Sequence, residues 1–236
     1  MKVMTIVGTR PEIIRLSEII KKLDYNFNHI LVHTNQNFDS ELKKIFYKQF
    51  KIKHPKYDLK IKEKTPIKTI SQILMKIENI IIKEKPDAFF ILGDTNSALS
   101  SIVAKKYKIP IFHYEAGNRC YDQRVPEEIN RKIIDHISDI NLTYSNFARD
   151  NLLREGLNVT RIIKIGSPLN EVIKANYKKI LSNKILDKLK LEKQNYFVFS
   201  FHREENVDSK INLQKFVKII NQLSKTHKEK IVLSLH

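Results

Sequence analysis

The chain has 236 residues, 42% of them hydrophobic, so it is long and apolar enough to bury a core, which excludes a wholly disordered protein. Lysine and arginine number 43 against 26 aspartates and glutamates, a formal net charge of +17 that favours acidic partners such as nucleic acid, acidic lipid or a phosphorylated metabolite. The basic runs carry no nucleic-acid module signature, and nucleic acid is therefore disfavoured as a partner.

Short β-branched runs alternate with longer helical patterns. Strands are predicted, in chain order, at 2–7, 29–34, 88–92, 109–113, 140–144, 161–165, 196–201 and 230–235. Helices are predicted at 11–22, 38–50, 67–83, 98–106, 126–138, 146–155 and 213–225. Because each parallel strand pair needs a crossover helix, this alternation predicts the α/β fold class with a doubly wound parallel sheet.

A composition shift near Gly166-Ser167-Pro168 predicts a boundary there, with one domain over residues 1–168 and a second over 169–236. The final apolar run, 231–235, has no covering helix after it, although a parallel strand is normally buried on both faces. We therefore expect the second domain to be incomplete, as in a chain that is cut short.

A single cysteine, Cys120, excludes an internal disulfide and a cysteine metal cluster, and it fits a reducing compartment. The apolar run at the amino terminus is too short for a signal peptide, and no segment approaches the roughly 20 apolar residues of a membrane span. We expect a soluble, cytoplasmic protein without a membrane partner.

Glycines mark one edge of the predicted sheet, because Gly8, Gly93, Gly117 and Gly166 closely follow the ends of apolar runs. Ligands of open α/β sheets bind beyond the carboxyl ends of the strands, where glycine lets backbone approach a ligand. The polar residues beside these glycines are therefore candidate site residues, although each glycine taken alone could simply make a tight turn.

The first of these loops, Gly8-Thr9-Arg10-Pro11-Glu12, precedes a predicted helix. Free N–H groups at that helix start, together with Arg10 and Arg15, predict a phosphate or carboxylate site. Neither a dinucleotide fingerprint nor a phosphoryl-transfer P-loop is present in the sequence.

The later loops add candidates for acid and base chemistry. Asp94 is either a general acid or base or a helix cap. His113 and Glu115 lack a second ligand pair with suitable spacing, which excludes a metal site. Glu127 and Arg131 lie four residues apart on one helix face, as part of a site or as an ordinary ion pair.

In the second domain, His202 follows a predicted strand and either faces the site or belongs to a solvated loop. Carboxylates, arginines and a histidine gathered at one edge favour chemistry on an anionic sugar derivative.

Six short motifs follow one another along the chain. They are Gly8-Thr9-Arg10-Pro11-Glu12, His33-Thr34-Asn35-Gln36-Asn37, Gly93-Asp94-Thr95, Glu115-Ala116-Gly117, Pro126-Glu127-Glu128-Ile129-Asn130-Arg131 and His202-Arg203-Glu204. With these motifs in this order, the sequence resembles the non-hydrolysing UDP-N-acetylglucosamine 2-epimerases along its whole length. The string from Glu115 to Arg131 looks most like the branch that forms UDP-N-acetyl-L-fucosamine.

The resemblance implies two Rossmann-like domains of the nucleotide-sugar glycosyltransferase type. It implies an enzyme of surface polysaccharide synthesis that inverts C2 of a UDP-N-acetylhexosamine by eliminating and re-adding UDP, with no cofactor and no metal. By motif match the catalytic group is Asp94, Glu115, Glu127 and His202, and the substrate-binding residues are Arg10, Arg15 and Arg131. His202 would serve the substrate and its diphosphate.

Two residues depart from the family pattern: Arg15 stands where many members have lysine, and Asn35 where glycine is common. Members of the family also continue well beyond His236, so we expect this chain alone to bind a UDP-sugar weakly. A nucleotide-sugar glycosyltransferase, or an inactive or split-gene fragment of an epimerase, remains an alternative. A homodimer and a separately encoded C-terminal half remain open as protein partners.

Overall fold

The computed structural model describes residues 1–35, 40–200 and 209–234. The chain divides into two compact units, Met1–Ala175 and Asn176–His236. Each unit has its own sheet, of seven strands in the first and two in the second.

The first unit contains a fully parallel sheet with the order β3-β2-β1-β4-β5-β6-β7. The strands are β1 (Lys2–Val7), β2 (Asn28–His33), β3 (Tyr57–Asp58), β4 (Ala88–Leu92), β5 (Ile111–Ala116), β6 (Ile140–Thr143) and β7 (Ile162–Lys164). The order reverses between β1 and β4, which is the point where ligands bind in doubly wound sheets. The predicted α/β fold class is confirmed.

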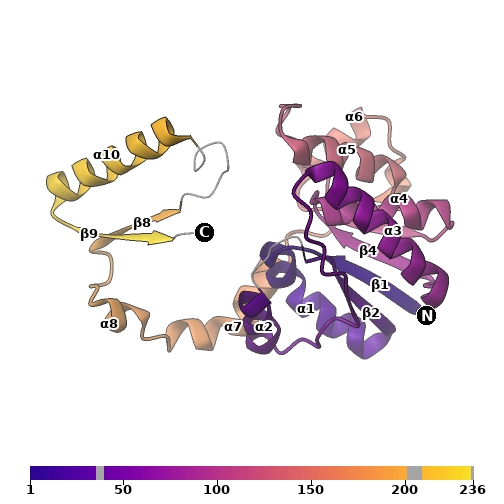
Figure 1. Cartoon of the computed structure of the whole chain (residues 1–236), viewed down its shortest axis with the longest axis horizontal. Helices are drawn as coiled ribbons and strands as arrows, with labels where there is room; N and C mark the ends of the chain where they lie inside the picture. Colours follow the sequence, from indigo (N-terminus) through magenta and orange to yellow (C-terminus); the bar gives the residue numbers. More distant parts are fainter. Residues whose placement is uncertain (36–39, 201–208, 235–236) are drawn as a thin grey trace. The chain divides into compact units, whose positions relative to one another are not determined.

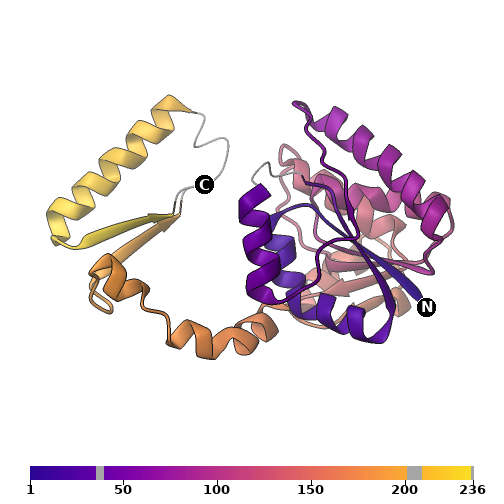
Figure 2. The same ribbon diagram turned by 60° about the horizontal axis from the view of Figure 1, so that its bottom comes forward.

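Helices cover both faces of this sheet (Figures 1 and 2). They are α1 (Arg10–Asn26), α2 (Ser40–Phe50), α3 (Pro66–Glu84), η1 (Asn96–Ser100), α4 (Ser101–Lys106), α5 (Pro126–Ile137), α6 (Asn146–Arg154), η2 (Val159–Arg161) and α7 (Leu169–Leu181), the last of which contains the division between the units. Ile73 and Ile77 of α3 join the core on one face, while Leu16 and Ile20 of α1 join the core on the other. Burial of alternate strand side chains on both faces holds this layered unit together.

The second unit comprises α8 (Ile185–Leu189), β8 (Tyr196–Ser200), α10 (Lys210–His227) and β9 (Lys230–Ser234). β8 and β9 pair in parallel, and α10 meets β8 through an edge contact between the rings of Phe216 and Phe199. None of the described side chains of this unit is buried, and Val198 is 64% exposed. The described part of the second unit therefore has no closed core of its own.

The predicted strand at 109–113 is displaced, because β5 begins at Ile111 and continues to Ala116. Ile109 instead ends the preceding helical turn, where its N–H donates to the carbonyl of Ala104. Pro110 follows and has no N–H to donate to a ladder. The shift brings Glu115 into the strand itself.

The position of Gly117, just after β5, requires a residue without a side chain for two reasons. Its φ is +79°, and a Cβ there would overlap the carbonyl oxygen of Ala148 in α6. Gly156, after α6, has a similar φ of +83°, but a Cβ there would meet no heavy atom within 4 Å. The two glycines share a backbone conformation and differ in available space.

We expect Gly117→Ala to lower the free energy of unfolding by at least about 3 kcal/mol, because backbone strain and overlap add. Gly156→Ala carries the strain alone and should cost about 1 kcal/mol. Urea unfolding of both variants and the parent chain measures the difference. Equal losses would show that the loop adjusts freely to the added methyl group.

Candidate functional site

The loops after β1 and β4 are joined by one buried carboxylate, that of Glu12. Its Oε2 accepts the N–H groups of Gly8 and Thr9 at 2.8 and 2.6 Å and the Thr9 hydroxyl at 2.9 Å. Its Oε1 accepts the hydroxyl of Thr95 at 2.9 Å. Burial raises the pKa of Glu12, although these hydrogen bonds oppose the shift. Four donors thus fix the two loops against each other at the point where the sheet reverses order.

Asp94, directly after β4 and Gly93, forms an ion pair with Arg131 of α5. The preceding residue of α5, Asn130, donates its side-chain N–H to the Asp94 carbonyl at 2.9 Å. The N-cap residue of η1 is Thr95, so Asp94 does not cap this helix. Burial, followed by weaker effects that include repulsion from Arg15, lowers the pKa of Arg131. The ion pair with Asp94 and the Asn130 hydrogen bond join α5 to the loop after β4.

Glu115 has a strained backbone, with φ at +73° and a register shift between Tyr114 and Ala116 on the side of β6. Its carboxylate accepts from Arg15 NH1 at 2.6 Å, and from the Tyr144 hydroxyl and the Asn118 side chain at 3.4 Å each. β-Bulges of this kind re-aim side chains next to functional sites. Burial, with smaller effects that include the nearby Glu115 charge, raises the pKa of Tyr144.

These contacts form a continuous network. Arg131 pairs with Asp94 and also donates to the carbonyl of Asn118 at 3.3 Å, and Asn118 reaches Glu115. The structure therefore brings together four of the predicted site residues, namely Asp94, Glu115, Arg15 and Arg131.

Glu127 lies apart from this network, exposed in the first turn of α5, without a hydrogen bond or ion pair to any residue that the structure describes. The ordinary helix ion pair considered for Glu127 and Arg131 is not formed, because Arg131 is directed to Asp94. Arg10 is half-buried at the start of α1. His202 lies outside the described residues.

The loop after β5 rests on buried charges. Asp135 of α5 accepts the N–H of Gly117 at 3.2 Å and lies 2.7 Å from Arg119 and 2.8 Å from the ring of His113. Burial opposes its ionisation, but His113 and Arg119 hold the pKa of Asp135 below its ordinary value. Arg119 continues the network as a bidentate partner of Glu155, at 2.7 and 2.6 Å.

Sequence reasoning missed Tyr144, Asn118 and Asn130 as contacts of the site. Tyr144 directly follows β6, so its place at a strand's carboxyl end was the signal, but no glycine lies beside it to mark the position. The two asparagines lie within the string from Glu115 to Arg131 and become visible only through their contacts.

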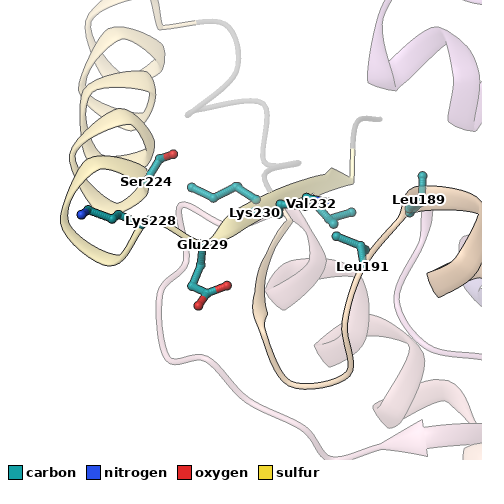
Figure 3. A pocket seen from close by; sticks show the side chains of 8 residues that line it. Leu189, Leu191, Ser224, Lys228, Glu229, Lys230 and Val232 are labelled. Carbon is teal, nitrogen blue, oxygen red and sulfur yellow. The ribbon is translucent and has the colours of Figure 1, made fainter.

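A separate pocket of about 430 Å³ lies in the second unit, lined by Leu189, Leu191, Ser224, Lys228, Glu229, Lys230, Ile231 and Val232 (Figure 3). The charged ends of Lys228 and Glu229 extend in different directions, so they do not converge on a ligand. Over the described ranges, no three His, Cys, Asp or Glu side chains gather as a metal site. The described helices also include none that could span a membrane.

Comparison with known proteins shows that the chain is similar to 2-epimerases of UDP-linked sugars. The family model described as UDP-N-acetylglucosamine 2-epimerase matches residues 21–236. The UDP-N-acetylglucosamine 2-epimerase of Methanocaldococcus jannaschii is 37% identical over the whole chain, and a Pseudomonas aeruginosa UDP-2,3-diacetamido-2,3-dideoxy-D-glucuronate 2-epimerase is 35% identical. The chain spans 66% and 67% of these two relatives.

A solved structure from Rickettsia bellii, a UDP-N-acetylglucosamine 2-epimerase, is 48% identical with a TM-score of 0.92. This chain is matched over its full length and covers 62% of that one. The M. jannaschii enzyme, solved with UDP-GlcNAc and UDP, has a TM-score of 0.91 over the full chain and is covered to 66%.

Adjacent glutamates of α5 allow a matched stability test. Glu128 is buried and accepts the N–H of Cys120 at 3.0 Å, whereas Glu127 is exposed. Burial opposes ionisation of Glu128, but the Cys120 N–H and the Lys132 charge hold its pKa below the ordinary value.

We expect Glu128→Ala to lower the free energy of unfolding by about 1 kcal/mol or more, since it removes a buried side chain and the acceptor of a part-buried N–H, and Glu127→Ala to change it by less than about 0.5 kcal/mol. Because the pKa of Glu128 is lowered in the folded state, its contribution to stability is present above the pKa of the unfolded state and is lost as pH falls. The gap in unfolding free energy between the two variants should therefore narrow in acid. Urea unfolding at neutral and acidic pH tests this; a gap that widens in acid would contradict it.

Proposed function

The chain belongs to the UDP-N-acetylglucosamine 2-epimerase family, and we propose that its site inverts C2 of a UDP-N-acetylhexosamine by eliminating and re-adding UDP. The supporting observation is the network in which Asp94 and Glu115, each paired with an arginine, meet at the carboxyl edge of the sheet. The structure of the M. jannaschii relative in complex with UDP-GlcNAc and UDP supports the same substrate class.

The proposed reaction needs two proton-handling groups. The C2 hydrogen beside an amide is hardly acidic, so departure of UDP must first build positive charge at C1. As the C1–O bond breaks, UDP leaves with the bonding pair, the C2 proton passes to a carboxylate, and its electron pair forms the C1–C2 double bond of a 2-acetamidoglycal. Re-addition of UDP with a proton delivered to the opposite face of C2 completes the inversion. Asp94, Glu115 and Glu127 are the carboxylates that we assign to these transfers, with His202 as a further catalytic group.

Arginines would hold the diphosphate. Arg15 and Arg131 belong to one network through Glu115, Asn118 and Asp94, so a diphosphate at this edge would be attracted by two guanidinium groups. Arg15 donates only one N–H to Glu115 among the described contacts, and its side chain is 37% exposed, which leaves planar donors for phosphate oxygens. Arg10, at the start of α1, would add the helix N-terminus to this anion site.

We assign the catalytic residues to a domain over 1–168 and nucleotide binding to a partial domain over 169–236. None of the described side chains of the second unit is buried, so we propose that a separately encoded C-terminal half, or a second copy of this chain, packs against it. The single cysteine fits a cytoplasmic location.

Incubation with UDP-GlcNAc in D2O tests the reaction. Because the C2 proton is lost to a solvent-exchanging carboxylate, each epimerised product should carry one deuterium, read by mass spectrometry. The assay is run on the chain alone and on a fusion of this chain with the part of the R. bellii relative beyond the match. Epimerised product without deuterium would reject elimination and re-addition, and no exchange by either protein would reject the function.

Substitution of single carboxylates tests their roles. Glu127→Gln should leave stability nearly unchanged, because the side chain is exposed, yet lower turnover by about 10²-fold or more, the scale of a lost acid or base. Asp150→Asn, an exposed carboxylate of α6, is the matched control that should retain turnover. Full activity of Glu127→Gln would show that Glu127 is an ordinary surface residue without a role in turnover.

A further inference from the structure

The imidazole of His113 in β5 is fully buried and lies between two loops of the site. Its Nε2 lies 2.9 Å from the carbonyl oxygen of Gly93, and its Nδ1 lies 2.8 Å from Oδ1 of Asp135. The Gly93 carbonyl can only accept, so Nε2 carries the proton and donates to it. The His113 ring therefore connects the loop after β4 with Asp135 of α5.

Asp135 is held from two further directions, because it accepts the N–H of Gly117 and lies 2.7 Å from Arg119, which pairs with Glu155. The His113 ring therefore contacts a carboxylate that is itself fixed to the loop after β5.

The two ends of the His113 bridge lie next to the proposed catalytic carboxylates. Gly93 directly precedes Asp94, and Asp135 holds the N–H of Gly117, two residues after Glu115. Glu115 has a φ of +73°, which is strained for a residue that carries a side chain. Strained backbone of this kind persists only where the surroundings hold it.

We propose that His113 and Asp135 are positioning residues that fix the spacing between Asp94 and Glu115. The role of the spacing rests on the proposed function, whereas the contacts that His113 makes can be tested without activity. A displacement of about 1 Å at the reacting groups is enough to cost about 10²-fold in rate.

Replacement of the buried ring by His113→Gln removes both of its contacts, and His54→Gln, at an exposed histidine, is the matched control.

The positioning role is measured by amide hydrogen exchange and by catalysis. In His113→Gln we expect exchange of the Gly117 amide to rise about tenfold or more, and no change in His54→Gln. Unchanged exchange in His113→Gln would overturn the bridge, whether or not the protein is active.

In the deuterium assay, with chain and fusion as above, His113→Gln should lower kcat about 10²-fold and change KM and the calorimetric UDP affinity less than twofold. Equal losses in UDP affinity and in kcat, or full activity, would contradict a role in spacing. An inactive parent with an intact bridge would instead reject the proposed function.

Discussion

The buried carboxylate of Glu12 is the contact on which the geometry of the site depends, because it joins the two loops where the sheet reverses its order. It has no arginine or lysine partner among the described contacts, and four donors compensate for its burial instead. A carboxylate accepts such donors from several directions, so one side chain orders both the start of α1 and the loop that carries Asp94. The anion site at the helix start and the first carboxylate are therefore placed by the same contact.

Charge in this site is organised at two depths. Glu12 and Asp135 are buried and saturated with partners, so they hold backbone in place. Asp94 and Glu115 lie nearer the surface and share their partners with arginines that we assign to the substrate. An arriving diphosphate would compete for those guanidinium groups, so ligand binding and the environment of the carboxylates are coupled by the same ion pairs. Glu12 and Asp135 keep the loops fixed while the diphosphate and the carboxylates compete for the arginines.

Much of the architecture could be predicted, because parallel strands leave a strong pattern of apolar runs between helices. The glycines that follow apolar runs marked the loops that the contact network joins, since Gly8, Gly93 and Gly117 all border that network. The sequence could not reveal that Arg131 is directed to Asp94 and not to Glu127. The four-residue spacing of Glu127 and Arg131 is the same in both cases, and only tertiary contacts distinguish them. Nor could it reveal the bridge from His113 to Asp135, whose members are separated by 22 positions and meet only after β5 and α5 have packed.

The two units differ in what they contribute to stability and to chemistry. Every buried hydrophobic side chain of the described structure lies in the first unit, up to Val172, and so do the described contacts of the site. Because catalytic groups must be held within fractions of an ångström, they belong on the part with a closed core. The second unit, without a buried side chain among its described residues, cannot supply comparable rigidity by itself. Binding energy taken from that unit would therefore depend on ordering it, whereas the spacing of the carboxylates is already fixed by the first.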